Sequence, residues 1–323
     1  MRSPRHQFTT AALAAGLVLT AASTAHAAQG GPADDRSVKP LTVAVIGDVP
    51  YGVAQEASVG VLVDAINRDP RVRLALHVGD IKSGSTTCSD ERFAAALATF
   101  ENFKDPVVYT PVDNEWTDCH RVNNGAYDPL ERLETVRATF FAEPGSLLGR
   151  RPATVDHQAE LVENVRWIDS RAAFATLHVV GSDNGLAPWT GLGNTVPTPE
   201  QSAEVEIRVA ATVAWVDATF DVAEEARLLG VVLAMQADTW DPLPSAGQQA
   251  VVDRIAERTA AFDGEVLLMQ GDSHEYLVDN PLGLDNLTRV VVHGATLPFE
   301  YLRLTINPVR DEIFTWERVP VAS

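Results

Sequence analysis

The sequence predicts an α/β fold in which a parallel or mixed β-sheet is covered by helices. Continuous apolar, β-branched runs recur along the chain, and such runs are typical of strands that are buried on both faces. They lie at residues 41–46, 73–78, 107–110, 174–180, 229–235, 265–269 and 289–293. Helical patterns separate most of them, as expected where helices connect neighbouring strands.

Two segments between the runs place apolar side chains on one helical face. The first contains Phe93, Leu97 and Phe100, and the second contains Val209, Val213, Val216 and Phe220. Thr198 is a candidate N-cap, followed by proline at the first helical position and by the capping-box residue Gln201. Asp128 precedes a second proline in the same way, so we expect it to cap another helix.

The last part of the chain differs from the rest. Residues 300–307 and 311–318 predict two strands around Asn307-Pro308, in an antiparallel hairpin that finishes a second sheet. The sequence contains no repeat and no convincing internal linker. We therefore predict one folded domain at residues 41–320.

The N-terminal segment has the pattern of a secretory signal. Arg2 and Arg5 precede an apolar run at 11–22, and small residues follow it, so we expect residues 1–27 to be removed. A membrane anchor is the alternative, although the run is short for one. Residues 28–40 are polar and glycine-rich, which predicts a disordered leader. The mature protein is then secreted or periplasmic and has no membrane contact.

The composition describes a soluble globular protein, with 46% apolar and 21% charged residues in 323. The formal net charge is −19, and the predicted signal contributes two arginines and no acid. Such a surface repels polyanions, and no basic stripe offsets it, so we expect no nucleic-acid partner. A small phosphate ester remains possible, because a metal ion reverses the local field.

Cys88 and Cys119 are the two cysteines of the sequence. In an oxidising compartment an even, minimal count favours one disulfide. Two unrelated thiols and metal ligation are the alternatives. Each cysteine follows a candidate site loop by a few residues, so a bridge between them would hold two of these loops together.

Potential metal ligands follow five of the predicted strands. They are Asp48, Asp80, the segment Asp113-Asn114-Glu115, Gln236, and the segment Gly271-Asp272-Ser273-His274. In open α/β sheets ligands bind beyond the carboxyl ends of the strands. A single aspartate after glycine is ordinarily a turn or a helix cap. The recurrence at successive strand ends indicates a shared metal site.

This order resembles the calcineurin-like metallophosphoesterase superfamily, whose usual series is D-x-H, G-D, G-N-H-[DE], a lone His and G-H-x-H. The resemblance extends from about residue 41 to residue 305. It implies a four-layer αββα sandwich of two mixed β-sheets flanked by helices. It also implies a metal-dependent phosphoesterase that hydrolyses a small phosphomonoester or phosphodiester through a metal-activated water. With the predicted signal, we expect this enzyme to be exported.

By this resemblance Asp80 bridges two metal ions, Asp48 and His274 bind the first, and Asn114 binds the second. Four histidines of the family pattern are replaced, by Pro50, Glu115, Gln236 and Asp272. Gln236 and Asp272 can still coordinate through oxygen, which makes the site harder. We expect one or two divalent ions of Mn, Mg, Fe, Zn or Ca. The alternative is a catalytically impaired protein that keeps the fold as a binding module.

Five further residues are candidates for catalysis, for substrate binding or for the lining of the cleft. Glu115 is a candidate general acid, with an ordinary ion-paired glutamate as the alternative. His120 either substitutes for a lost histidine or is a hydrogen-bonded loop residue. Arg121 and Lys82 either hold a substrate phosphate or are surface charges. Tyr51 either lines the cleft or packs as an ordinary aromatic side chain.

Overall fold

The computed structural model describes residues 39–322, and the predicted signal and all but the last two residues of the predicted leader lie outside this range. Within it, the strands form two mixed sheets. The five-stranded sheet has the order β12-β11-β1-β2-β3. Its strands are β1 (Leu41–Ile46), β2 (Leu74–His77), β3 (Val107–Tyr109), β11 (Glu300–Ile306) and β12 (Phe314–Pro320). Strands β1, β2 and β3 are parallel, and β11 is antiparallel both to β1 and to β12.

The seven-stranded sheet has the order β4-β5-β6-β7-β8-β10-β9. Its strands are β4 (Asp156–His157), β5 (Val165–Asp169), β6 (Ala172–Thr176), β7 (Gly230–Ala234), β8 (Glu265–Gln270), β9 (Leu277–Asp279) and β10 (Leu287–Val291). Strands β6, β7, β8 and β10 are parallel, whereas β4, β5 and β9 are antiparallel to their neighbours at the edges.

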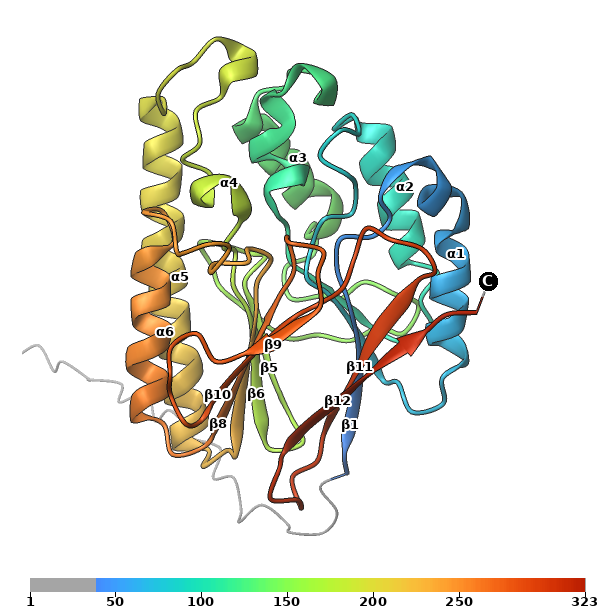
Figure 1. Cartoon of the computed structure of the whole chain (residues 1–323), viewed down its shortest axis with the longest axis vertical. Coiled ribbons are helices and arrows are strands. Elements are labelled where there is room, and N and C mark those ends of the chain that lie inside the picture. Colours follow the sequence, from blue (N-terminus) through green and yellow to red (C-terminus); the bar gives the residue numbers. More distant parts are fainter. Residues whose placement is uncertain (1–38, 323) are drawn as a thin grey trace, which may run out of the picture. The chain divides into compact units, whose positions relative to one another are not determined.

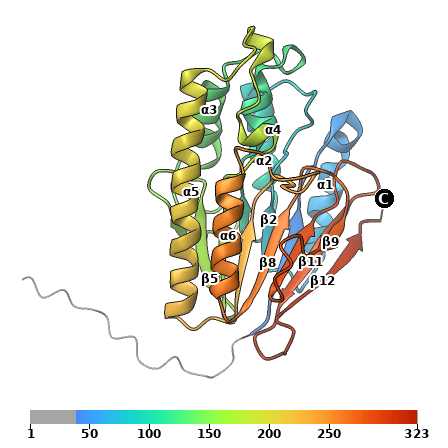
Figure 2. The same ribbon diagram turned by 60° about the vertical axis from the view of Figure 1, so that its left-hand side comes forward.

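Helices cover the outer face of each sheet (Figures 1 and 2). The helices are α1 (Gly52–Arg68), α2 (Asp90–Phe100), α3 (Pro129–Phe140), α4 (Gly181–Asn184), α5 (Pro199–Glu225) and α6 (Gln249–Ala261). Short 3₁₀ turns are η1 (Asp113–Glu115), η2 (Thr117–His120), η3 (Val122–Asn124) and η4 (Thr190–Leu192). The predicted caps are present, since Asp128 accepts from the first turn of α3 and Thr198 forms a capping box with Gln201 at α5.

The core alternates along each central strand. In β1, Val43 and Val45 point between the two sheets, whereas Ala44 and Ile46 pack under α1 and α2. In β7 the same alternation divides the residues between the inter-sheet core and the core under α5 and α6. Both faces of each strand are therefore covered, which explains the continuous apolar runs of the sequence. The predicted four-layer αββα sandwich is confirmed.

Two expectations about the sheets need correction. The C-terminal hairpin forms, but it does not finish a second sheet, because β11 pairs with β1 and so extends the first. Its second strand begins at Phe314 instead of 311, since the loop spans residues 307–313. The short edge strands β4, β5 and β9 were not predicted, because segments of two to five residues carry too little periodicity.

Candidate metal centre

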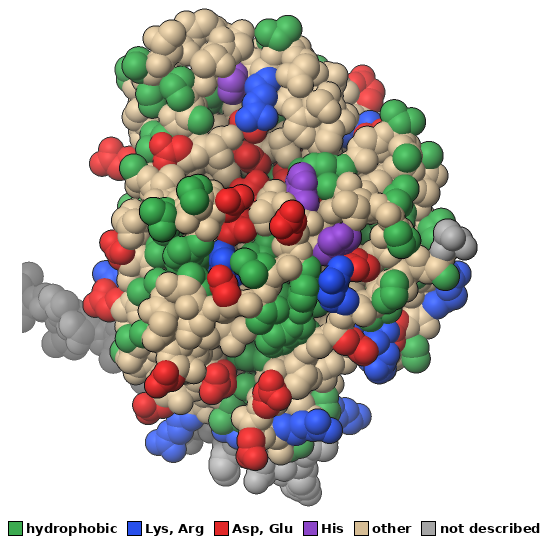
Figure 3. All heavy atoms as spheres, viewed as in Figure 1, with side chains coloured by type: hydrophobic (Ala, Val, Ile, Leu, Met, Phe, Trp, Pro, Cys, Tyr) green, Lys and Arg blue, Asp and Glu red, His purple; other side chains and the backbone are tan. Residues whose placement is uncertain are grey.

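The candidate ligands meet where the parallel strands of both sheets end. Asp48 follows β1, Asp80 follows β2, η1 follows β3, Gln236 follows β7 and Asp272 follows β8. This side of the molecule carries Asp and Glu side chains in a hollow with histidines beside it (Figure 3). The predicted convergence of the strand ends is therefore found in the structure.

The backbone at these positions is in the left-handed region. Asp48, Asp80, Asp272 and His274 have φ values of 53°, 61°, 76° and 64°. Such conformations are costly for residues other than glycine and cluster at functional sites, where the surroundings hold them. Asp48 is also tightly enclosed, because a Cβ atom at Gly271 would lie 2.9 Å from its Oδ2.

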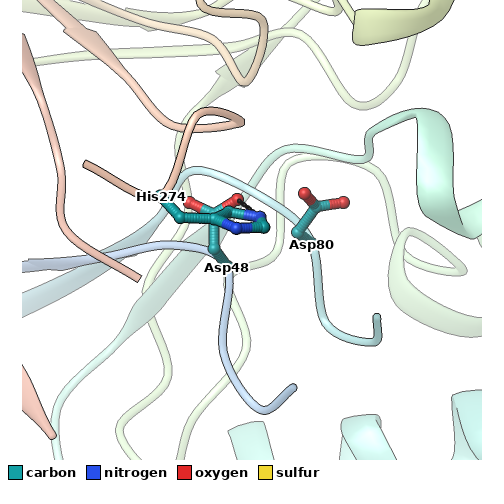
Figure 4. A group of neighbouring side chains, drawn as sticks. All are labelled: Asp48, Asp80 and His274. Carbon is teal, nitrogen blue, oxygen red and sulfur yellow. Dashed lines mark ion pairs between the residues drawn. The ribbon is translucent and has the colours of Figure 1, made fainter. Parts of the chain in front are cut away.

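Asp48, Asp80 and His274 form the first group of side chains with the geometry of a metal site (Figure 4). Each offers a ligand atom, and these atoms all lie within 4.8 Å of one another. Nε2 of His274 lies 3.4 Å from Oδ1 of Asp48, which also accepts a hydrogen bond of 3.1 Å from the Asp272 backbone N–H. Oδ2 of Asp48 is buried and has no hydrogen-bond partner among residues 39–322. A buried, unsatisfied carboxylate oxygen is costly, and a cation would satisfy it.

Asp80, Asp113 and Asp272 form a second group under the same distance limit. The two groups share Asp80. Asp113 belongs to the predicted ligand segment after the third predicted strand, but the family resemblance assigned the metal there to its neighbour Asn114. The position of its side chain depends on contacts with residues far along the chain, so adjacency was the one signal that the sequence offered for it.

The two amide side chains of the predicted ligand set face the carboxylates with their nitrogens. Nδ2 of Asn114 donates to Oδ1 of Asp80 at 2.7 Å and to the Tyr51 hydroxyl at 2.8 Å. Nε2 of Gln236 donates to Oδ1 of Asp113 at 3.0 Å. In this arrangement both residues orient aspartates.

Tyr51 is a member of the site. Its hydroxyl donates to Oδ2 of Asp80 at 2.6 Å, and its ring packs edge-on against His274 with centroids 4.8 Å apart. Together with the Asn114 amide, this hydroxyl gives each carboxylate oxygen of Asp80 a donor. Asp80 is thus fixed in orientation from two sides.

Glu115 is placed as a link between two loops. It is fully buried, and its two carboxylate oxygens accept from the backbone N–H groups of Ile81 at 2.7 Å and Val112 at 3.0 Å. These bonds tie the loop after β2 to the end of β3. Burial raises the pKa of Glu115 to about 7. Because both oxygens are occupied, this geometry leaves neither free to face a substrate.

The other three predicted residues, His120, Arg121 and Lys82, make contacts outside the two groups of candidate ligands. The backbone N–H of Gly191 donates to Nδ1 of His120 at 3.1 Å, so this ring packs on the η4 turn. Arg121 is half-exposed and pairs with Asp118 at 2.6 Å. Lys82 is fully buried and is therefore not a surface charge; its ammonium donates to the Ser83 carbonyl at 3.2 Å.

The cysteines form the predicted disulfide. Cys88 and Cys119 are bonded and fully buried. Cys88 follows the Asp80 loop and Cys119 lies in η2 after Asn114. The bridge therefore joins the loops that follow β2 and β3, both of which supply site residues.

Burial and mutual repulsion shape the protonation of the carboxylates. Burial raises the pKa of Asp48 to about 7, and burial with the charge of Asp238 raises that of Asp272 to about 6. Burial and neighbouring charges hold the pKa values of Asp80 and Asp113 well above the usual range. Lys82 and Arg121 offset only part of this negative charge, and the donor set of carboxylates with one imidazole suits a divalent cation.

Neither the protein-family models nor the curated proteins contain a match to the sequence. The fold does match solved structures. A dimetal phosphatase from Danio rerio has 12% identity and a TM-score of 0.51, over 87% of this chain and 99% of that one. GAP50, the anchor in the inner membrane complex of Plasmodium, has 10% identity and a TM-score of 0.49, over 88% and 90%. The purple acid phosphatase PPD1 of yellow lupin has 11% identity and a TM-score of 0.46, over 88% and 54%.

At these identities the likeness concerns the fold. The chain has the calcineurin-like metallophosphoesterase fold, as the motif resemblance implied. It also carries groups of acidic and histidine side chains able to bind metal at the carboxyl ends of the strands. Among residues 39–322, none of the helices is long and apolar enough to cross a membrane.

Proposed function

We propose that this protein is an exported, metal-dependent phosphoesterase that hydrolyses a small phosphomonoester or phosphodiester. The proposal rests on two sets of potential metal ligands at the strand ends, which have Asp80 in common. In the first set, one buried oxygen of Asp48 has no hydrogen-bond partner among the described residues. Clustered, desolvated like charges destabilise a fold, so a functional cation gives their presence a physical reason.

Asp48, Asp80 and His274 would hold the first ion. When bound, a divalent cation in such a site acidifies a water molecule and stabilises the charge that develops on phosphoryl oxygens. Tyr51 and Asn114 keep the Asp80 carboxylate oriented by donating to its two oxygens. Arg121, half-exposed and held by Asp118, is the candidate contact for a substrate phosphate. The acidic surface favours a small ester over a nucleic acid.

Export is part of the proposal. The disulfide between Cys88 and Cys119 supports it, because such bonds persist in oxidising compartments. The predicted signal at residues 1–27 lies outside the described residues. Secretion or periplasmic location follows if the mature protein begins after this segment, which N-terminal sequencing of the exported protein would establish.

A metal-binding protein without hydrolytic activity is the second candidate. The observation in its favour is the placement of Glu115, where the family pattern has a histidine that assists the leaving group. Both oxygens of Glu115 are bound by backbone amides, so this side chain offers no proton to a leaving group in this geometry.

One experiment separates the candidates. The chelated protein is reconstituted with Mn, Mg, Zn or Ca and assayed with p-nitrophenyl phosphate and bis-p-nitrophenyl phosphate. We expect turnover with at least one ion and a loss of at least ~100-fold in Asp48→Asn. The exposed Asp156→Asn is the matched control and should retain activity. Metal binding without turnover under every condition would favour the second candidate, and absence of both would refute the proposal.

A further inference from the structure

Two of the predicted metal ligands, Asn114 and Gln236, turn the nitrogens of their side-chain amides, and not the oxygens, toward the carboxylates of the site. The Gln236 side chain has a fixed orientation, because its Oε1 accepts the Gly181 backbone N–H at 2.7 Å and a backbone N–H can only donate. Its Nε2 must then face Asp113. Asn114 is oriented in the same way, since its Nδ2 donates to the Asp80 carboxylate.

Asp113 lies where the side-chain nitrogen of Gln236 points. Its Oδ1 accepts from the Asn114 backbone N–H at 2.9 Å and from Gln236 at 3.0 Å. Its Oδ2 lies on the side of Ser182 and Asp272, and the Ser182 hydroxyl is 3.3 Å away. One oxygen of Asp113 is thus used for positioning. The other remains on the side where the carboxylates of the second group converge.

Gly181 permits this approach. A Cβ atom at this position would lie 2.5 Å from Oδ2 of Asp113 and 3.0 Å from Oδ2 of Asp272. The α4 turn therefore closes against both carboxylates only because residue 181 has no side chain. Both oxygens therefore lie close to one point beside this glycine.

The α4 turn is itself strained. Ser182, Asp183 and Asn184 have φ values of 51°, 56° and 53°, a left-handed run that costs roughly 1–2 kcal/mol per residue. Arg208 supports the turn by donating to the Asn184 carbonyl at 2.7 Å, and the Asn184 side chain donates to the Gly247 carbonyl at 2.7 Å. The turn places the Ser182 hydroxyl between two carboxylates, donating to Asp118 at 2.8 Å.

From this geometry we infer that the second cation position of the centre is rebuilt around Asp113. Asp80, Asp113 and Asp272 hold the ion, and Gln236 acts as a positioning residue through its hydrogen bond to Asp113. The inference rests on the metal centre of the proposed function. It differs from the expectation of the family resemblance, by which Asn114 binds the second ion.

The ligand chemistry gives the rebuilt position a selectivity. Its three side chains offer only carboxylate oxygen, whereas the first group includes the imidazole of His274. Oxygen-only sites favour hard cations such as Mg, Mn and Ca, and imidazole favours Zn. We therefore expect the second position to take Mn or Mg and to bind Zn weakly.

Metal stoichiometry tests the inference without an activity assay. Chelated wild type, Asp113→Asn and Asn114→Ser are titrated with Mn²⁺ by calorimetry, with bound Mn²⁺ followed by electron paramagnetic resonance. We expect two ions in wild type, with the weaker one lost or weakened at least ~100-fold in Asp113→Asn. Asn114→Ser should keep both ions within about tenfold, because its side chain acts through Asp80. Circular dichroism of each metal-free variant checks that it folds.

The possible outcomes distinguish a failure of this inference from a failure of the proposed function. Loss of the second ion in Asn114→Ser with retention in Asp113→Asn would restore the family assignment and overturn the inference. A wild type that binds one ion, unaffected by Asp113→Asn, would also overturn it. Should Asp113→Asn fail to fold, Gly181→Ala supplies the same test, since its methyl group would intrude between the two carboxylates. Two ions bound by wild type, one of them lost selectively in Asp113→Asn, would leave the inference standing even if the protein showed no turnover, and that absence of turnover would refute the proposed enzyme.

Discussion

Asp80 belongs to both sets of potential metal ligands. Its replacement by asparagine therefore tests whether repulsion among the carboxylates, relieved by a bound cation, governs the candidate metal centre. Asparagine keeps the size of the side chain and removes its charge. We expect Asp80→Asn to stabilise the metal-free protein and to abolish the stabilisation that divalent cations give to wild type.

The magnitude follows from the spacing of the carboxylates. At the 4.8 Å limit and an effective dielectric constant of ~20, two unit charges repel by about 3.5 kcal/mol. Protons shared within the cluster remove much of this repulsion. Loss of a charged acceptor for Tyr51 and Asn114 costs about 1 kcal/mol. The difference sets an upper limit of about 2.5 kcal/mol on the gain in the free energy of unfolding, and the shared protons make the observed gain smaller.

Urea denaturation at pH 8 measures the effect, because Asp48, with a pKa of about 7, is then largely ionised. Wild type, Asp80→Asn and the exposed control Asp64→Asn are unfolded with EDTA and with excess Mn²⁺. A cation at a hundred times its dissociation constant adds about 2.7 kcal/mol to the stability of wild type and of the control. Asp80→Asn should show less than ~1 kcal/mol of this gain.

Two results would refute the reasoning. If Asp80→Asn were less stable than wild type in EDTA while still folded, repulsion would not dominate the cluster. If Mn²⁺ stabilised Asp80→Asn as much as wild type, the ion would bind elsewhere. Equal behaviour of the control and wild type is required before either result is interpreted.

Three further predictions concern the rest of the molecule. The pKa of Asp48 is about 7 in the folded state against 3.8 unfolded, so protonation stabilises the metal-free protein at low pH, and about 4 kcal/mol is lost as the pH rises from about 4 to 7. Calorimetry in EDTA from pH 4 to 8 should show a melting temperature that falls up to about pH 7 and then levels off, and Mn²⁺ should restore it. Burial would raise the pKa of Glu163, but its hydrogen bonds with His178 and an arginine lower this pKa to about 2. About 3 kcal/mol of stability is therefore present above pH 4.5 and is lost as the pH falls towards 2. In Glu163→Gln, unfolding followed by circular dichroism should depend less on pH in this acid range. The double variant of Cys88 and Cys119 to serine should lose about 3–4 kcal/mol in urea denaturation, because the bridge spans 31 residues, and an unchanged midpoint would contradict this.

The sequence by itself determined the layered fold and the strands that carry the site. Residues 41–46 and 229–235 are apolar without interruption because helices and the opposing sheet cover both faces of each strand. Asp48, Asp80 and Asp272 lie just beyond strand ends, and such positions converge in any parallel sheet. These features depend on local periodicity and on a general rule of topology, so they can be read along the chain.

Tertiary structure decided what each polar side chain does at the site. Gln236 turns its nitrogen to Asp113 because the Gly181 backbone, 55 residues away, occupies its oxygen. Glu115 links two loops because the ends of β2 and β3 aim their amides at it. The direction of a hydrogen bond is fixed by partners that the fold brings together, and no local pattern encodes them. The sequence therefore located the metal centre, and the fold decided which side chains can hold the ions.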